Sequence, residues 1–144
     1  HPGLVQALRA FSATTLGPAA ADVRRLQAPP RGVLFQPAES VTEEGFVAIR
    51  RFHGGAHGVI YIRTVFSADK AAKGELLYGT DGPVRVWVNG KAVGCVREAT
   101  NPAVAGQHKA AVAWKKGANE VIFALHTQKG KAWGVIARCK LNRS

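Results

Sequence analysis

Few side chains in this sequence are arranged for catalysis. The nine acidic residues are scattered, and no two stand at a spacing that would place paired carboxylates across a sugar ring, as glycoside hydrolysis normally requires. There is no Gly-x-Ser-x-Gly elbow, no glycine-rich phosphate loop that leads into a helix, and no His-Glu-x-x-His motif. We therefore expect a protein that is not an enzyme.

Histidines are the residues that would most readily bind a metal. His53 and His57 enclose Gly-Gly-Ala, so a loop could bring two imidazoles together, but glycine here more simply indicates a turn between strands. His1 could chelate copper through its amine and ring, as in oxidative polysaccharide-cleaving enzymes. Nothing else in the sequence resembles those enzymes, and a tag remnant explains His1 more simply. We expect no metal and no cofactor.

The three tryptophans are candidates for ligand binding, because the indole ring stacks on sugar faces and nucleobases. Trp114 is in phase with Val112 and is expected in the core. Trp87 faces away from the neighbouring valines and could lie under an N-terminal arm. Trp133, flanked by Lys131, is the tryptophan that we expect to be exposed as a binding platform.

The net charge of +11 favours a polyanionic partner. The excess is uneven, because residues 101–144 hold eight Lys and Arg side chains and one acid. Acidic polysaccharide, nucleic acid and anionic membrane are the candidates, and the alternative is a solvated basic surface that serves solubility. No apolar run is long enough to span a membrane, no signal peptide is recognisable, and no nucleic-acid-binding motif is present. Polysaccharide is the expected partner.

Alternating apolar residues and turn signals predict an antiparallel β-sandwich. Asp81-Gly82 and Asn89-Gly90 favour the positive φ angles of two tight hairpins, and Lys115–Gly117 and Lys129–Lys131 indicate further turns. Both faces of the run 119–126 are largely apolar, which predicts a central strand. The expected strands are Phe46–Phe52, Val59–Phe66, Glu75–Tyr78, Val84–Asn89, Ala92–Val96, Lys109–Trp114, Asn119–His126 and Trp133–Lys140.

The first 32 residues have a different pattern from the rest. Leu4, Leu8 and Phe11 recur at helical spacing, which predicts a short amphipathic helix that ends before residues 17–18. A second helical run is expected over Ala19–Gln27. We divide the chain into an N-terminal arm or linker, residues 1–32, and a sandwich domain, residues 33–144. The chain contains no methionine, which favours an excerpt of a longer protein.

Cys95 and Cys139 are the only cysteines, and each falls in an expected strand. Two cysteines are too few for a tetrahedral thiolate site, and this pair is too far apart in sequence for a redox Cys-x-x-Cys motif. A single disulfide and two buried thiols remain the alternatives.

Three segments carry a family resemblance: LLYGTDGPVRVWVNGKAVG, VAWKKGANEVIFAL and KAWGVIARCKL. Together they resemble the galactose-binding-like jelly-roll domains that are attached to bacterial secreted glycoside hydrolases, lyases and esterases. The resemblance covers about residues 58–140. It implies a jelly-roll fold, a covalently attached catalytic domain, and a secreted or periplasmic location.

The resemblance also indicates where this chain departs from the family. Relatives often carry paired acids where this chain has Thr80-Asp81, and the closing strand here lacks the acid that helps bind a structural calcium in many relatives. We therefore expect no calcium. The glycines of the motif, together with Asn119 after the Gly117 turn, serve turn geometry.

These observations predict a noncatalytic carbohydrate-binding module that recognises an acidic polysaccharide, with cations pairing to carboxylate or sulfate and an aromatic ring stacking on sugar. The alternative is a structural interdomain module that packs on a neighbouring catalytic domain and binds no glycan; the N-terminal arm and the apolar, outward Trp87 motivate it. Two loops, residues 97–108 and 129–133, are expected to supply the site. The predicted contacts are Arg97, Asn101, His108, Lys129, Lys131 and, as the platform, Trp133.

Overall fold

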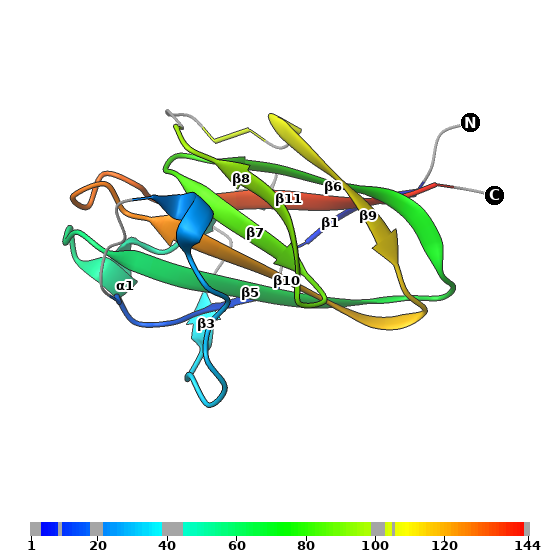
Figure 1. The fold of residues 1–144 in the computed structure, drawn as a ribbon, viewed down its shortest axis with the longest axis horizontal. Helices are drawn as coiled ribbons and strands as arrows, with labels where there is room; N and C mark the ends of the chain where they lie inside the picture. The colour runs from blue at the N-terminus through cyan, green and yellow to red at the C-terminus, as the bar shows by residue number, and fades with distance from the viewer. Residues whose placement is uncertain are drawn as a thin grey trace.

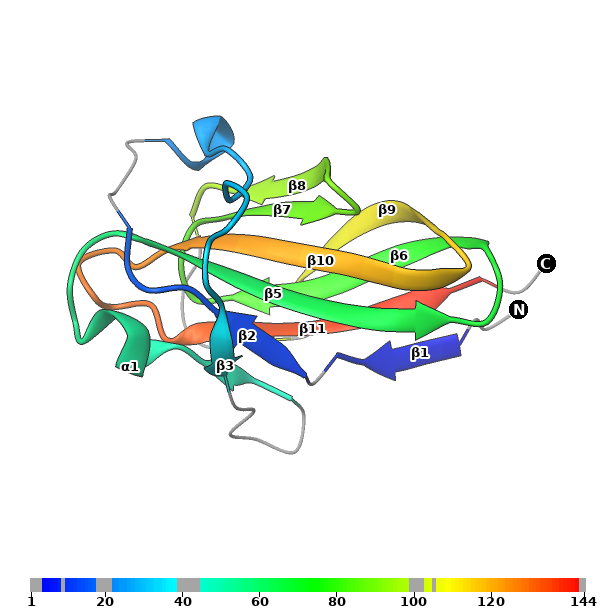
Figure 2. The same cartoon turned by 90° about the horizontal axis from the view of Figure 1, so that it is seen from below.

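Two antiparallel sheets pack face to face in the computed structural model, which describes residues 4–8, 10–17, 22–38, 45–98, 103–104 and 106–142 (Figures 1 and 2). The five-stranded sheet has the order β1 (Leu4–Ala7), β11 (Gly134–Leu141), β6 (Ala72–Thr80) and β9 (His108–Trp114), with β4 (Val47–Ala48) pairing to β11. The six-stranded sheet has the order β3 (Gln36–Ala38), β2 (Phe11–Ala13), β5 (Val59–Ala68), β10 (Gly117–His126), β7 (Val84–Val88) and β8 (Lys91–Val96). The predicted all-β sandwich is confirmed.

The described helical structure consists of two short turns, η1 (Val23–Arg25) and α1 (Arg50–His53). None of the described helices is long and apolar enough to cross a membrane. A strand was expected over Phe46–Phe52, but only Val47 and Ala48 pair with β11. The chain then turns through α1, which ends at Gly54 in the left-handed conformation with a φ of 58°.

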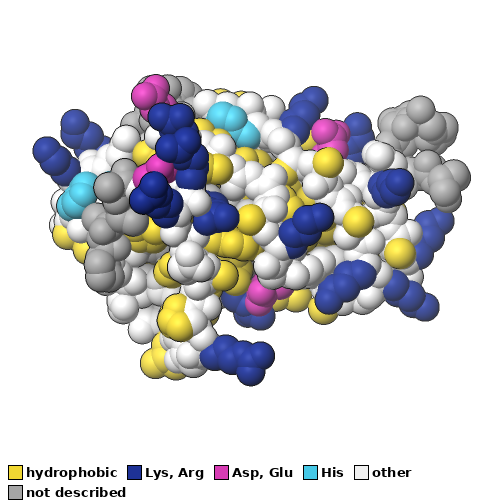
Figure 3. All heavy atoms as spheres, in the orientation of Figure 1, with side chains coloured by type: hydrophobic (Ala, Val, Ile, Leu, Met, Phe, Trp, Pro, Cys, Tyr) yellow, Lys and Arg dark blue, Asp and Glu magenta, His cyan; other side chains and the backbone are white. Residues whose placement is uncertain are grey.

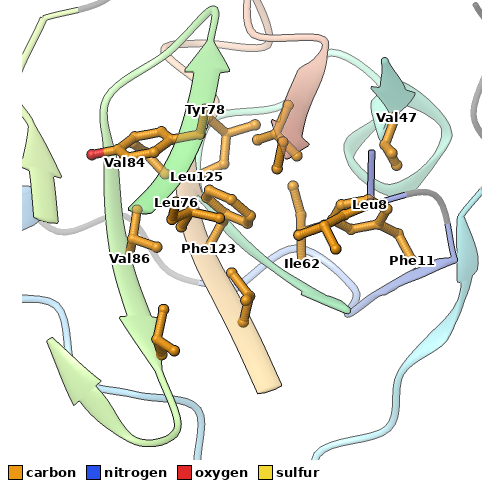
Figure 4. Close-up of a cluster of buried hydrophobic side chains, with 14 of the residues drawn as sticks. Leu8, Phe11, Val47, Ile62, Leu76, Tyr78, Val84, Val86, Phe123 and Leu125 are labelled. Carbon is orange, nitrogen blue, oxygen red and sulfur yellow. The ribbon is translucent and has the colours of Figure 1, made fainter. Parts of the chain in front are cut away.

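Valine and leucine side chains from both sheets form the core (Figure 4). Val84, Val86 and Val88 point inward, as expected from their alternation along the strand. β10 lies between β5 and β7, and its residues 121–125 are buried on both faces, which confirms the predicted central strand. Trp114 is 2% exposed and contacts Phe66 edge to face, so its predicted core position is also confirmed.

The N-terminal helix predicted over Leu4 to Phe11 is wrong. Residues 4–7 form β1 on the edge of the five-stranded sheet, and residues 11–13 form β2 in the six-stranded sheet. The apolar spacing reflects two strands that bury Leu8 and Phe11 between the sheets. A helix this short is marginal by itself, whereas pairing with β11 and β5 satisfies the backbone hydrogen-bonding groups. Of the second predicted helix, the described part contains only η1.

Only one of the two predicted hairpins forms. Asn89 and Gly90 have φ angles of 50° and 81° and join β7 to β8, as expected. Asp81-Gly82 instead connects β6 in one sheet to β7 in the other, so this hairpin prediction is wrong. The buried Asn119 binds the backbone of the turn that precedes it, donating to the carbonyls of Lys115 and Gly117, as expected.

Residues 22–27, which include η1, cover the outer face of the six-stranded sheet at Trp87 (Figure 2). Val23 and Leu26 pack with Trp87, which is only 5% exposed. The guanidinium of Arg85 donates to the carbonyl oxygens of Arg24 and Leu26 and holds the segment in place. The N-terminal segment therefore covers Trp87, a position that the sequence analysis allowed for this tryptophan.

The two cysteines are free thiols in the structure. Cys95 is exposed on β8, and Cys139 is buried on β11 in the other sheet. Burial raises the pKa of the Cys139 thiol to about 11, so this side chain is an inert part of the core.

Candidate functional site

Three predicted site residues lie in the loop between β10 and β11, which we call the ligand loop and define as residues 127–133. Lys129 and Lys131 are exposed, and Trp133 is 49% exposed, as expected for a platform. The guanidinium carbon of Arg50, on α1, lies 5.2 Å from the centre of the Trp133 ring. A half-exposed indole therefore stands among cationic side chains at one end of the sandwich.

Arg97 lies in a polar pocket next to the ligand loop. The pocket has a volume of about 380 Å³ and includes Gln128, the loop residue that precedes Lys129. Its full lining is Asp22, Val23, Arg24, Pro83, Arg97, Glu98, His126 and Gln128. An ion pair of 2.7 Å joins Asp22 to Arg24, and the hydrogen bonds from Arg24 lower the pKa of Asp22 to about 2. Arg97 and Glu98 add one charge of each sign.

The structure does not bring His108 into this arrangement. His108 lies at the start of β9, where its ring contacts Tyr78 at a centroid distance of 5.5 Å, and it does not line the pocket. Its Nε2 is buried and has no hydrogen-bond partner among the described residues. Asn101 lies outside the described residues.

Asp81 holds the end of the ligand loop, which the sequence analysis missed by treating this residue as part of a turn. Its carboxylate accepts hydrogen bonds from the backbone N–H of Trp133 at 2.9 Å and of Gly134 at 3.1 Å. Burial raises the pKa of Asp81, and these hydrogen bonds partly offset the rise. The carboxylate therefore positions Trp133, and its hydrogen bonds are made to backbone N–H groups. No signal in the sequence distinguished this role from that of a turn residue.

Histidine nitrogens hold the rest of the ligand loop. Nδ1 of His57 accepts a hydrogen bond from the N–H of Lys129 at 2.9 Å, and Nδ1 of His126 accepts one from Gln128 at 3.1 Å. His53 bonds through Nε2 to the carbonyl of Ala132 at 2.9 Å. The predicted turn around His53 and His57 is confirmed, but the sequence did not indicate that these rings anchor another loop.

The arrangement is suited to binding. Among the described residues, no group of three or more His, Cys, Asp or Glu side chains is placed to hold a metal ion. The guanidinium of Arg50 lies over the half-exposed indole, and the polar pocket includes Gln128 of the same loop. Figure 3 shows Lys and Arg side chains distributed over one face of the molecule, with few Asp and Glu side chains among them. A ligand with negative charges and an apolar ring face would complement this end of the sandwich.

No protein-family model and no curated protein matches this sequence. Solved structures do share its fold. A GH2 β-galacturonidase from Eisenbergiella tayi matches with a TM-score of 0.60 and 14% identity over 99% of this chain and 25% of its own. A β-glucuronidase from an uncultured Clostridium matches with a TM-score of 0.57 and 12% identity over 99% and 30%. A β-glucosidase from Kluyveromyces marxianus matches with a TM-score of 0.54 and 12% identity over 93% and 17%.

The chain spans less than a third of the length of each of these enzymes. At such identities the similarity establishes a shared fold. It locates that fold as one part of much larger glycosidase chains.

Proposed function

We propose that this chain is a noncatalytic module of a larger, exported carbohydrate-active enzyme and that it binds an acidic polysaccharide. The observation that carries the proposal is the ligand loop, which exposes Lys129, Lys131 and Trp133 and whose residue Gln128 lines the pocket that contains Arg97. The fold supports an accessory role, because the chain matches a limited part of several glycosidases, two of which are named for uronic acid substrates.

Recognition would divide between the aromatic ring and the cations. The indole of Trp133 stacks on the apolar face of a sugar, while Arg50 rests against the same ring and orients it. Lys129 and Lys131 supply positive charge for carboxylates of successive sugars, and the guanidinium of Arg97 offers a planar, two-pronged contact. Uronic acid polymers provide both features in every repeat.

The described acidic residues support a noncatalytic role. Most of them are engaged: Asp81 binds backbone N–H groups, Asp22 pairs with Arg24, Glu120 with Arg63, and Glu75 lies 3.9 Å from Lys140. Asp69 lies in the turn between β5 and β6, and Glu98 follows β8 at the pocket. The two therefore belong to separate parts of the fold and form no pair across a sugar.

The test is affinity electrophoresis of the purified chain in gels that contain polygalacturonate or a neutral glucan, at low and high salt. We expect retardation by polygalacturonate that survives high salt in part, and much weaker retardation by the glucan. The variants Trp133→Ala and Lys131→Ala should each lose most of the retardation. Both side chains are exposed, so their loss should leave the fold unchanged.

A matched control is Lys116→Ala, which removes the same charge as Lys131→Ala. Lys116 precedes β10 and the ligand loop follows it, so the two lysines are separated by a ten-residue strand, about 30 Å. The control should bind as wild type does. Equal binding by wild type, Trp133→Ala and Lys131→Ala would contradict the assignment of these two residues to the binding site. Equal retardation by the two glycans would contradict the proposed ligand class.

A further inference from the structure

The ligand loop is held in an unfavourable backbone conformation. Gln128, Lys129 and Gly130 have consecutive positive φ angles of 49°, 59° and 82°. Residues with a Cβ atom rarely adopt this region, and two in succession require support from outside the segment. At Gly130 a Cβ atom would lie 2.0 Å from the carbonyl oxygen of Gly55. The backbone of the loop therefore packs closely against the turn that carries His57.

Two imidazoles supply that support, one to each non-glycine residue. The N–H of Gln128 donates to Nδ1 of His126, and the N–H of Lys129 donates to Nδ1 of His57. A ring nitrogen accepts a hydrogen bond only when it carries no proton, so both rings must be neutral and hold their proton on Nε2. When an imidazole takes up a second proton, Nδ1 becomes a donor that faces another donor.

The two rings are also in contact with each other. Their centroids lie 4.7 Å apart in an edge-to-face arrangement with an interplanar angle of 73°. Neutral rings pack well in this geometry, whereas two imidazolium ions at this distance repel each other. Proton uptake therefore removes two hydrogen bonds and adds a repulsion at the same place.

The charged groups around His57 and His126 differ on the two sides of the rings. His126 faces Asp22 and Arg24 from η1 and Arg97 and Glu98 from the end of β8, which cancel in formal charge. Arg50 on α1 donates to the carbonyl of Gly130, and the side chain of Lys129 is on the loop itself. His53, also on α1, binds the loop at Ala132. Cations thus predominate on the loop side of the two rings.

We propose that the ligand loop is released by acid: proton uptake by His57 and His126 frees the amides of Lys129 and Gln128, and residues 128–131 leave their positive-φ conformation. The sandwich stays folded, because β10 remains paired with β5 and β7 and Asp81 still holds Trp133 and Gly134. Resting on the proposed function, a consequence is that acidic glycan is bound near neutral pH and released in acid.

The pKa of His126 determines how its contribution to folding stability changes with pH. Burial, followed by the charge of His57, lowers the pKa of His126 below its ordinary value of 6.5. The unfolded chain then binds more protons than the folded chain as the pH falls below that value. The contribution of His126 to folding is therefore complete above about pH 6.5 and declines below it, until the folded protein is protonated as well.

The experiment is amide hydrogen exchange by NMR at about pH 7.5 and about pH 5, corrected for intrinsic exchange rates, with strand amides of β10 as internal reference. We expect the protection of the Gln128 and Lys129 amides to fall at least about tenfold at the lower pH while that of the strand amides stays constant. The double variant His57→Asn/His126→Asn keeps an acceptor oxygen near each Nδ1 position but does not titrate, so its loop should remain protected at both pH values.

The control is His108→Asn, which removes a histidine that contacts neither the loop nor the pocket and should retain the wild-type response. If the double variant misfolds, the nitrogen shifts of the wild-type imidazoles decide the question, because a protonated Nδ1 on either ring at neutral pH overturns the proposal. Unchanged loop protection at about pH 5, or an equal loss in the double variant, also overturns it.

Binding of polygalacturonate at the same two pH values separates this inference from the proposed function. Carboxylates, with pKa values near about 4, remain mostly ionised at about pH 5, so a loss of binding reports on the protein. If loop protection falls while no glycan binds at either pH, the acid release stands and the glycan function fails. If glycan binds equally at both pH values with the loop protected, the acid release fails and the glycan function stands.

Discussion

At the scale of single residues, Asp81 determines where Trp133 can stand. Its side chain reaches from the crossover between β6 and β7 to Trp133 and to Gly134, the first residue of β11, and it is 5% exposed. A buried carboxylate is costly unless hydrogen bonds compensate it, and here two backbone donors do so. The same residue therefore ties the crossover to the start of β11 and fixes the backbone at Trp133.

Replacing Asp81 by alanine should leave the N–H groups of Trp133 and Gly134 without their acceptor. Each unsatisfied buried group costs about 1–3 kcal/mol, so we expect the free energy of unfolding to fall by about 2–4 kcal/mol. Asp81→Asn, which keeps one acceptor oxygen, should cost less. Urea denaturation at neutral pH measures both, with Asp69→Ala in an exposed turn as the control. A loss no larger than that of the control would show that these hydrogen bonds contribute little.

At the scale of elements, the segment of residues 22–27 acts as a cover for the six-stranded sheet. Sheets in a sandwich bury one face and leave the other to solvent, yet Trp87, Ile122 and Ala124 on the outer face are apolar. Val23 and Leu26 complete a second, smaller core above them. The segment also forms one wall of the pocket that contains Arg97, so its packing bears on the candidate site.

Leu26→Ala should therefore destabilise the protein and expose Trp87. Leu26 is 7% exposed, and removal of such a side chain costs about 2–5 kcal/mol when the site cannot collapse; we expect a value near the lower end because this cluster is small. Thermal unfolding and quenching of tryptophan fluorescence measure the two effects. Leu34→Ala is the matched control, since Leu34 is 83% exposed and should have almost no effect. Similar results for both leucines would contradict the proposed cover.

At the scale of the whole molecule, positive charge is widespread. The outer face of the five-stranded sheet carries Lys73, Lys109, Arg138 and Lys140, which alternate with inward residues such as Leu76, Ala110 and Cys139. Glu75, beside Lys140, is the acid on that part of the sheet. Under the proposed function, general attraction of polyanions would extend over this sheet face, whereas stacking on Trp133 would belong to one end of the sandwich.

Salt should separate these two contributions. The screening length falls from about 10 Å at 0.1 M salt to about 3 Å at 1 M, so wild-type affinity for polygalacturonate should fall steeply between these conditions. The ratio of wild-type to Trp133→Ala affinity should stay nearly constant, because stacking depends little on ionic strength. Calorimetric titration of both proteins at both salt concentrations gives the ratio. A ratio that approaches one at high salt would mean that Trp133 acts only within a general charge attraction.

The sequence by itself determined the features that depend on neighbours along the chain. Strands β5 to β11, the Asn89-Gly90 hairpin and the turn stabilised by Asn119 follow from side-chain alternation and local turn chemistry. The burial of both faces of β10 could be predicted in the same way, because residues 121–125 of this strand are all apolar. The exposure of Trp133 followed from its place beside a lysine-rich turn.

Only the tertiary structure decided the features that depend on distant partners. Residues 4–7 and 11–13 become strands because β11 and β5 offer them hydrogen bonds, although their local spacing resembles a helix. The ring of His57 and the N–H of Lys129 are 72 residues apart in sequence, and Asp81 and Trp133 are 52 apart. Local patterns carry no information about such pairs. The ligand loop could be located from sequence, but what holds it could be seen only once the sheets had brought these groups together.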